Sequence, residues 1–310
     1  MLDKIKAVIF GHAVADALGV PVEFCTREEL DETPLETMQG FGTYPVPEGS
    51  WSDDTSMTLC ALDVLANGGI DYDAIMINFC KWYYKDEFTP TGEMFDVGNS
   101  CSNAIEKYFR MNMKALECGD SEERSNGNGS IMRILPFALY AEFANSDSRW
   151  LEMIHNASAL THAHERSAIG CGIYSVIVRS LLANPSKEAV YTALDEAKQY
   201  YKDYAEFHHY GRLFNEEFRK TERSEIKSSG YVVSTLEAAV WCLLTTESYA
   251  ECVLKAVNLG NDTDTVAAVA GGLAGALYGF DSIPDEWLGA LQKYDFIEEM
   301  CIRASENWNK

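Results

Sequence analysis

The chain has 310 residues, of which 47% are hydrophobic and 24% are charged, and its 25 basic and 48 acidic residues give a net charge of −23. This composition is typical of a globular protein with a large apolar core, and it favours one domain over two. The strong negative charge argues against direct binding to nucleic acid or to an anionic membrane, because both would repel it.

Helical periodicity dominates the chain from its N-terminus onward. Apolar residues at helical spacing predict a helix at residues 5–18, which Pro21 ends, and another at 56–65, which Gly68 and Gly69 end. The same pattern predicts helices at 72–84, 103–113, 133–143, 150–160, 165–182, 186–204, 235–244, 249–259 and 265–278. Alternating strand patterns are nearly absent, so the sequence predicts an all-α bundle.

Three stretches between these helices have the composition of loops. Residues 39–51 are rich in glycine and proline, and residues 117–130 contain three glycines among polar side chains. Residues 208–230 are polar and charged, which indicates a surface segment or an insertion. No repeat, low-complexity tail or linker divides the chain, so we expect residues 1–310 to form a single domain.

The nine cysteines include no pair three positions apart, so the sequence contains no zinc knuckle and no thioredoxin-like motif. Most of them lie in apolar helical patterns, which indicates buried thiols in a reducing compartment. The first residues contain too short an apolar run for a signal peptide, and the run 266–277 is too short to span a bilayer. We therefore expect a cytoplasmic protein.

An acidic cluster, Ser52-Asp53-Asp54-Thr55, precedes the helix expected at 56–65. Serine and aspartate are common helix N-caps, so such a cluster has a purely structural explanation. One oxygen is enough for a cap, however, and the second carboxylate adds repulsion that a cation would relieve.

A second acidic cluster, Asp262-Thr263-Asp264-Thr265, precedes the helix that contains Gly271, Gly272 and Gly275. It has the same structural explanation, since carboxylates are favoured near a helix N-terminus. Three glycines weaken an isolated helix, but they suit a central helix whose neighbours approach closely. Carboxylates buried at the start of such a helix are costly unless they are paired or bind a metal.

Roughly two hundred residues separate the two clusters, and a fold that joins them would create a pocket lined by oxygen atoms. Carboxylate and hydroxyl ligands without histidine or cysteine suit Mg, Mn or Ca rather than Zn or Cu. Three or more shared carboxylates suggest two ions bridged by an aspartate. Residue types alone leave helix capping and metal binding as open alternatives.

Two further motifs are polar. Asn126-Gly127-Asn128-Gly129-Ser130 precedes a helix and could offer backbone N–H groups to an anion, although such runs are usually turns. In Thr161-His162-Ala163-His164 the two histidines do not share a helix face, so they do not form a zincin-like pair.

Five motifs, in order along the chain, resemble those of the ADP-ribosylglycohydrolases. They are the segment 11–24 from Gly11 to Phe24, the segment 49–55 with its double aspartate, the segment 127–133 followed by Pro136, the pair Thr161-His162, and the segment 258–265. The resemblance extends from about residue 7 to residue 280. Residues 96–98 and 230–233 are similar to the branch that contains ADP-ribosyl-dinitrogen reductase hydrolase.

This resemblance implies a single-domain orthogonal bundle of α-helices with two divalent cations, Mg or Mn, in a central cleft. By the same resemblance, one side of the metal pair is held by Ser52, Asp53 and Asp54. The other side is held by Asp262, Asp264 and Thr265, and Asp264 bridges the ions.

The resemblance also implies a binding site for ADP-ribose. The glycine loop and His162 match positions that hold the diphosphate and ribose, and Tyr231 matches an aromatic residue that packs on adenine. Glu23 matches an acid beside the metals, and Asp96 matches an acid on the side of the leaving group. The loop positions concerned are Gly127, Asn128, Gly129 and Ser130.

The activity implied is cleavage of the bond that joins ADP-ribose to a protein side chain, most simply arginine. Metal ions would orient the ribose and activate a water molecule, and Glu23 or the metal-bound Asp54 would accept its proton. Asp96 would hold the cationic leaving group. Local cations, backbone N–H groups and Arg133 would offset the charge of the diphosphate.

The chain departs from the family pattern at three positions, where Ser52 replaces threonine, Ala15 replaces a common glycine, and Asn261 occupies a position that is often glycine or aspartate. None of these changes removes a metal ligand, so we expect an active enzyme. The alternatives are hydrolysis of ADP-ribosyl-serine or another linkage, a non-catalytic ADP-ribose-binding or crystallin-like relative, and an unrelated two-metal phosphohydrolase.

Overall fold

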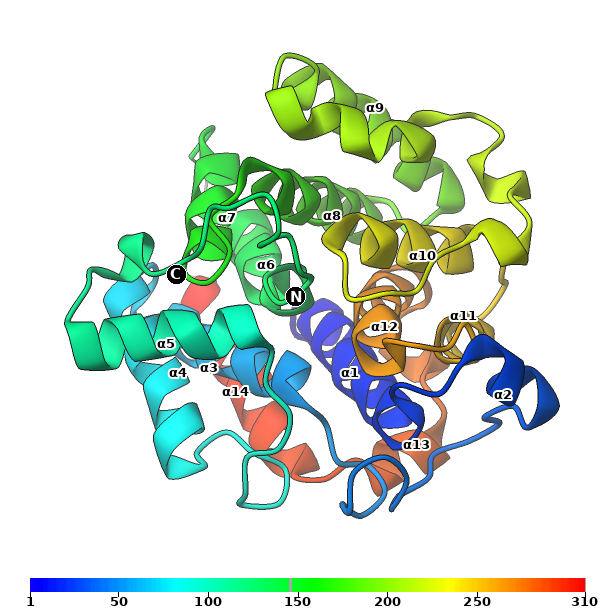
Figure 1. The fold of residues 1–310 in the computed structure, drawn as a ribbon, viewed down its shortest axis with the longest axis horizontal. Helices are drawn as coiled ribbons and strands as arrows, with labels where there is room; N and C mark the ends of the chain where they lie inside the picture. Colours follow the sequence, from blue (N-terminus) through cyan, green and yellow to red (C-terminus); the bar gives the residue numbers. More distant parts are fainter. Residues whose placement is uncertain (145–146, 310) are drawn as a thin grey trace.

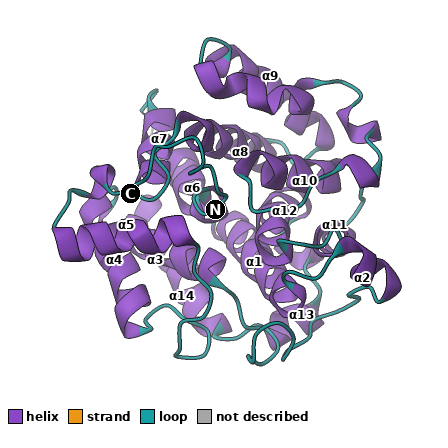
Figure 2. Cartoon of the chain, in the orientation of Figure 1, coloured by secondary structure: helices purple, strands orange, loops and turns teal. Residues whose placement is uncertain are grey.

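The computed structural model describes residues 1–144 and 147–309, and these contain helices and turns but no strand. Figures 1 and 2 show the helices packed at steep angles to one another around a central pair. The α-helices are α1 (Leu2–Gly19), α2 (Arg27–Glu32), α3 (Asp53–Gly68), α4 (Tyr72–Lys85), α5 (Asn99–Met111), α6 (Leu135–Phe143), α7 (Trp150–Ala159), α8 (Glu165–Ala183), α9 (Lys187–Tyr201), α10 (Val232–Leu244), α11 (Tyr249–Val257), α12 (Thr263–Tyr278), α13 (Asp285–Ala290) and α14 (Tyr294–Trp308).

The all-α prediction is confirmed, and each predicted helix overlaps an observed one. The helix expected at 133–143 starts two residues later, because Ile131–Arg133 forms a 3₁₀ turn and α6 begins at Leu135 with Pro136 in its first turn. Helices α2, α13 and α14 were not predicted from the sequence. The last of these buries Ile297, Met300, Cys301, Ala304 and Trp308, which follow helical spacing.

The core pair is α1 and α12, which lie side by side at the centre of Figure 1. Glycines bring their backbones together, since a Cβ atom added to Gly271 would lie 2.2 Å from the carbonyl oxygen of Gly11. A Cβ atom at Gly275 would lie 2.0 Å from the carbonyl oxygen of Ala7. The glycines of α12 therefore permit this close approach, as expected for a central helix.

The end of α1 also contacts the start of α12. A Cβ atom at Gly19 would lie 2.3 Å from the Cα atom of Asp264, and the Thr263 hydroxyl donates a 2.8 Å hydrogen bond to the Gly19 carbonyl oxygen. This contact places the last turns of α1 next to the second acidic cluster.

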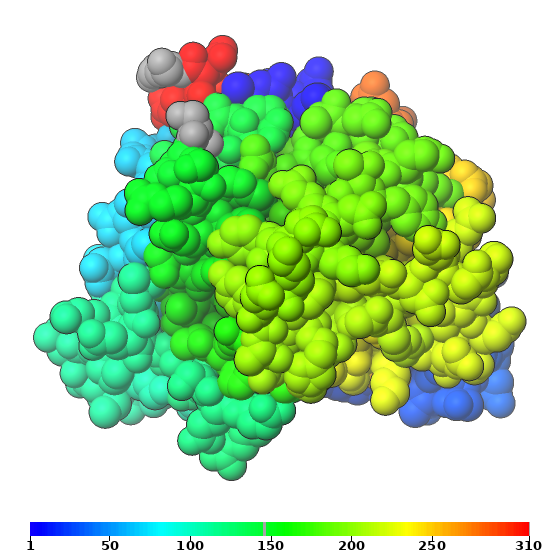
Figure 3. All heavy atoms as spheres, turned by 90° about the horizontal axis from the view of Figure 1, so that it is seen from above, coloured from blue at the N-terminus to red at the C-terminus, as the bar shows by residue number. Residues whose placement is uncertain are grey.

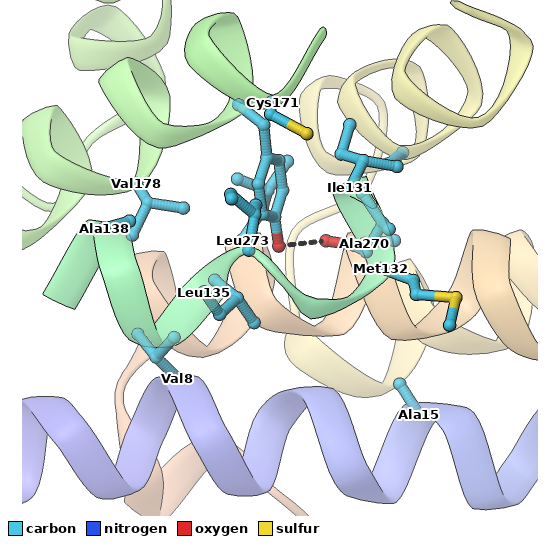
Figure 4. Close-up of a cluster of buried hydrophobic side chains, with 14 of the residues drawn as sticks. Val8, Ala15, Ile131, Met132, Leu135, Ala138, Cys171, Val178, Ala270 and Leu273 are labelled. Carbon is cyan, nitrogen blue, oxygen red and sulfur yellow. Dashed lines mark hydrogen bonds between the residues drawn. The ribbon is translucent and has the colours of Figure 1, made fainter. Parts of the chain in front are cut away.

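Two helical stretches, Leu2–Val22 and Glu165–Ala183, are long and apolar enough to cross a membrane by length and composition alone. In the most apolar 18-residue part of each stretch, 89% and 78% of the residues are buried inside the fold. Figure 4 shows the packing that buries them, with Val8 of α1, Leu135 of α6, Cys171 of α8 and Leu273 of α12 directed into one apolar cluster. Packing between helices thus accounts for their apolar composition.

The segment between α9 and α10 contains the 3₁₀ helices Ala205–Phe214, Phe218–Lys220 and Arg223–Glu225. Most of its side chains are exposed, while Tyr210, Leu213, Phe218 and Ile226 are buried. In Figure 3 the chain around residue 200 covers much of one face of the molecule.

Candidate functional site

The two acidic clusters, far apart in sequence, meet at the N-termini of α3 and α12. Asp53 and Asp54 are the first residues of α3, and Asp264 lies in the first turn of α12. The Thr265 hydroxyl donates a 3.3 Å hydrogen bond to Asp54 Oδ1, which joins the two clusters directly. The fold thus brings the two acidic clusters together, as the hypothesis of a shared pocket requires.

Asp16, on α1, completes this arrangement, although it was not singled out from the sequence. Its Oδ1 accepts a 3.0 Å hydrogen bond from the Ser52 N–H, and its Oδ2 accepts bonds from the Thr55 N–H and hydroxyl at 3.0 and 2.6 Å. It therefore holds the first acidic cluster in place. The sequence does contain a hint of this role, because Asp16 and His12 are polar residues in a helix whose other buried side chains are apolar or small.

Two groups of carboxylates are close enough to share a metal ion. In each of them, one oxygen atom per residue lies within 4.8 Å of the others. The first group is Asp16, Asp54 and Asp264, and the second is Glu23, Asp96 and Asp264. Asp264 belongs to both, which is the arrangement that a bridging ligand between two ions requires.

Burial and mutual repulsion raise the pKa values of these carboxyl groups. Burial raises the pKa of Asp16 to about 6, and burial together with the charge of Asp96 raises the pKa of Glu23 to about 8. Burial first, and then neighbouring carboxylates, raises the pKa values of Asp54 and Asp264 well above the usual range. Such a cluster is unstable in its charged form unless a cation neutralises it.

The donor set fits a hard divalent cation. Asp54 Oδ2 and Glu23 Oε2 are buried and have no hydrogen-bond partner among the described residues. Unpaired carboxylate oxygens at this depth need a positive charge, and oxygen ligands of this kind suit Mg, Mn or Ca. The residues that could hold such ions directly are Asp16, Glu23, Asp54, Asp96 and Asp264.

The other expected metal ligands lie beside these groups with partners of their own. The Ser52 hydroxyl accepts a 3.3 Å hydrogen bond from the Asp54 N–H and caps α3. Asp53 Oδ2 accepts a 3.3 Å bond from the Gly98 N–H, and Asp262 Oδ2 accepts a 2.8 Å bond from the Asn128 amide. Ser52 is thus placed as a cap, and Asp53 and Asp262 face the neighbouring loops.

A cavity of about 340 Å³ opens over the carboxylates. It contains most of the residues expected to bind substrate, and its walls come from segments throughout the chain. The lining residues are Glu23, Phe24, Asp53, Asp96, Val97, Gly98, Asn99, Ser100, Cys101, Gly127, Asn128, Gly129, Met132, His162, Gly230, Asp262 and Thr265.

The glycine loop is held by the chain that leads into α10. The Asn128 N–H donates a 3.0 Å hydrogen bond to the Gly230 carbonyl oxygen, and Gly127 pairs with Tyr231 in an isolated bridge. The Asn128 amide also donates to the Thr235 hydroxyl at 3.0 Å. Tyr231 therefore lies next to the cavity, and the guanidinium of Arg166 lies 5.8 Å from the centre of its ring.

Two polar side chains near the glycine loop, Ser130 and Arg133, do not line the cavity. The Ser130 hydroxyl is buried and contacts Cys171 Sγ at 3.3 Å, so only its backbone could face a ligand. Arg133 is fully buried, with its guanidinium 5.1 Å from the centre of the Phe79 ring. If Arg133 offsets the charge of the diphosphate, it does so from a buried position and not by direct contact.

Two aromatic residues at the cavity were not foreseen from the sequence. The Tyr44 hydroxyl interacts with the carboxyl groups of Glu23 and Asp96, and these interactions partly oppose the rise in their pKa values. Phe24 lines the cavity with 68% of its surface exposed and a φ of 66°. A bulky residue rarely adopts this conformation, which is more common at functional sites.

A third group of possible metal ligands, Glu123, His164 and Glu206, surrounds Arg166. The Arg166 guanidinium pairs with Glu123 at 2.7 Å and with Glu206 at 2.6 Å. His164 Nδ1 accepts a 3.2 Å hydrogen bond from the Arg166 N–H and caps α8. This group is an ion-pair network that already contains its cation.

The packing of Gly129 gives a prediction for the cavity wall. A Cβ atom at Gly129 would lie 2.8 Å from both Cys101 Sγ and His162 Cε1, so Gly129→Ala should displace the His162 ring. We expect ligand binding to weaken by roughly 10- to 100-fold, as for other small displacements in a site, measured by calorimetry with ADP-ribose. Gly127→Ala is the control, since its Cβ would meet no atom closer than 3.4 Å. Equal effects of both changes would contradict the steric argument.

Comparison with known proteins gives concordant matches over the whole chain. The family model described as ADP-ribosylglycohydrolase matches residues 1–310. ADP-ribosylarginine hydrolase Tri1 of Serratia proteamaculans is 34% identical over 308 residues, which cover 97% of this chain and 78% of that protein. ADP-ribosyl-[dinitrogen reductase] glycohydrolase of Rhodospirillum rubrum is 31% identical over 293 residues, which cover 93% and 90% of the two chains. A solved structure described as an ADP-ribosylglycohydrolase-related protein complex superposes with a TM-score of 0.83 at 28% identity, covering 100% of this chain and 99% of that one.

Proposed function

The chain belongs to the ADP-ribosylglycohydrolase family, and we propose that it is a metal-dependent enzyme that removes ADP-ribose from arginine side chains of modified proteins. Hydrolysis of a glycosidic bond is the chemistry named for its relatives. The observation that carries the proposal is the position of Asp264 in two carboxylate groups, one of which also contains Glu23 and Asp96 of the cavity wall.

We propose two divalent cations, Mg or Mn, one held by Asp54 and Asp264 and the other by Asp264 and Glu23, while Asp16 positions the first acidic cluster and Asp96 faces the leaving group. When bound, the ions supply Lewis acidity that orients ribose hydroxyls and makes a water molecule more acidic. Asp53, Asp262 and Thr265 line the same cavity and support this arrangement through their contacts with the loops and with Asp54.

Glu23 is the residue best placed to hold the proton of the attacking water. Its Oε2 is buried and has no partner among the described residues, and its carboxyl lines the cavity. Asp54 is the alternative base, but its carboxylate lies deeper and does not line the cavity. Asp16 has its oxygens occupied by Ser52 and Thr55 and acts as a positioning residue.

The arginine linkage is supported by the charge of the cavity wall. Asp96 and Glu23 lie together at the cavity, and no lysine or arginine is among its lining residues. A guanidinium leaving group would pair with such carboxylates, whereas a serine hydroxyl gains nothing from a negative wall. The name of the Serratia relative, an ADP-ribosylarginine hydrolase, also supports the arginine linkage.

The linkage is tested by measuring ADP-ribose release from arginine-modified and serine-modified proteins with Mg or Mn present, and again with excess chelator. We expect release from the arginine-modified protein only with metal. Asp96→Asn should lower arginine release by roughly 10- to 1000-fold, the range for losing a hydrogen-bonded charge, and should affect serine release far less. Glu93→Gln, at an exposed acid nearby in the chain, is the matched control.

Faster release from the serine-modified protein would favour the other linkage. Tight ADP-ribose binding without any release would favour a non-catalytic, crystallin-like protein. Release of phosphate instead of ADP-ribose would favour a two-metal phosphohydrolase. Binding of ADP-ribose that is equally tight in excess chelator would contradict the role of the metals.

We further propose that the protein works in the cytoplasm on modified proteins and binds neither nucleic acid nor membranes directly. Its nine cysteines are all free, and eight of them are buried, which suits a reducing compartment. The net charge of −23 is unfavourable for polyanionic partners.

A further inference from the structure

A chain of hydrogen bonds connects the buried Arg133 to the cavity through Thr161 and His162. Arg133 Nη2 donates a 2.7 Å bond to the Thr161 hydroxyl oxygen, which lies 2.8 Å from His162 Nδ1. His162 lines the cavity, although only 2% of its surface is exposed. Arg133 is therefore connected to the cavity through two hydrogen bonds, although it does not line the cavity itself.

The guanidinium of Arg133 fixes the role of the Thr161 oxygen. A guanidinium has donors only, so Thr161 Oγ1 must accept from Nη2. Nη1 donates a 3.1 Å bond to the Ala157 carbonyl oxygen, and no carboxylate pairs with Arg133 among the described residues. The hydroxyl hydrogen of Thr161 is then free to point at another acceptor.

Two acceptors are within reach of that hydrogen, His162 Nδ1 at 2.8 Å and Cys101 Sγ, and the ring nitrogen is the stronger because sulfur is a weak acceptor. The imidazole is neutral, since burial and the charge of Arg133 lower the pKa of His162 to about 3. A neutral imidazole carries one proton, and a ring whose Nδ1 accepts from Thr161 carries it on Nε2. Nε2 lies beside the glycine loop, 3.4 Å from where a Cβ atom at Gly127 or Gly129 would stand.

We propose that Arg133 and Thr161 are positioning residues that fix His162 as an Nε2–H donor aimed into the cavity, toward a phosphate oxygen of the bound ADP-ribose. The ligand named here depends on the proposed function, whereas the direction of the hydrogen bonds does not. A neutral donor of this kind recognises an anionic oxygen and does not attract the nearby carboxylates of the metal site as a cation would.

The tautomer can be measured in the metal-free and ligand-free protein labelled with ¹⁵N at histidine. Two-bond nitrogen–proton correlation spectra distinguish Nε2–H from Nδ1–H, and we expect His162 to be almost entirely Nε2–H. Thr161→Val removes the hydroxyl and should raise the Nδ1–H fraction, and Thr161→Ser should restore the wild-type spectrum. A wild-type ring protonated on Nδ1, or no change in Thr161→Val, would overturn the proposal.

Binding measurements with substitutions at position 162 test the same idea without disturbing Arg133. A glutamine amide can place a donor near Nε2, while an asparagine amide reaches only the position of Nδ1. We expect His162→Gln to bind ADP-ribose in the presence of Mg within a few-fold of wild type, and His162→Asn to bind roughly tenfold more weakly, as for the loss of one hydrogen bond to a charged group.

Thr161→Val should weaken ADP-ribose binding by a similar factor and Thr161→Ser should not, which separates the hydroxyl from the packing of this residue. Equal binding by His162→Gln and His162→Asn would contradict the proposed donor. The spectra are independent of any hydrolysis, so a protein that proves inactive toward all linkages would refute the proposed function and leave the tautomer result unaffected.

Discussion

Replacing Asp264 by alanine is expected to abolish ADP-ribose release and to empty both metal positions. Asp264 is the residue that the two carboxylate groups share, so its loss removes a ligand from each. Metal-ion catalysis stabilises a transition state by several kcal/mol, and we therefore expect kcat/KM to fall by at least about a thousandfold. Metal content after dialysis and isothermal titration with Mn would be measured alongside activity.

The control for this variant is Asp285→Ala, which removes the same charge at an exposed position in α13. It should retain full activity and metal content. Asp264 also accepts a 2.8 Å hydrogen bond from the Thr265 N–H, so circular dichroism must show that the variant is folded. A folded Asp264→Ala protein that still binds two ions would show that Asp264 does not bridge them.

The metal-free protein is expected to lose stability as the pH rises from about 4 to about 8. In the folded protein the pKa of Asp16 is raised to about 6 and that of Glu23 to about 8. At a pH between the ordinary pKa of each acid and its raised value, the folded protein therefore holds protons that the unfolded chain has released. Stability falls with pH wherever the folded state holds the extra protons. For Asp16 alone, a shift of about two units corresponds to roughly 3 kcal/mol.

Thermal unfolding in excess chelator across this pH range would measure the effect. Saturating Mg or Mn should raise the melting temperature most at the alkaline end, because the cations stabilise the charged carboxylates. Asp16→Asn should flatten the pH dependence of the metal-free protein, while Asp281→Asn, at an exposed acid, should not. A metal-free protein that becomes more stable between pH 5 and 8 would contradict the burial of these groups.

Much of the fold could be predicted because buried helices impose a regular pattern on the sequence. The two acidic clusters were also visible, since two carboxylates in a row exceed what a helix cap needs. Their meeting depends on the packing of α1 against α12, and no local pattern encodes which helices become neighbours. The metal roles followed from resemblance to a family and not from periodicity.

The roles of Asp16 and Arg133 could not be predicted from the sequence. Asp16 lies within the first motif, but its hydrogen-bond partners Ser52 and Thr55 are 36 and 39 residues away in sequence, and only the packing of α1 against the start of α3 brings them together. Arg133 follows the glycine loop, and its charge suggested that it offsets the charge of the diphosphate. The 3₁₀ turn at Ile131–Arg133 instead directs its guanidinium toward Phe79 and Thr161.

The hydrogen bond between Thr265 and Asp54 also has a consequence for synthesis on the ribosome. Roughly two hundred residues separate the partners. At translation rates of about 5–20 residues per second, the second cluster is synthesised on the order of 10–40 s after the first. During that interval α1 and α3 carry Asp16, Asp53 and Asp54 without α12. The nascent chain must keep these acids hydrated until α12 emerges, so the core pair of helices can close only late in translation.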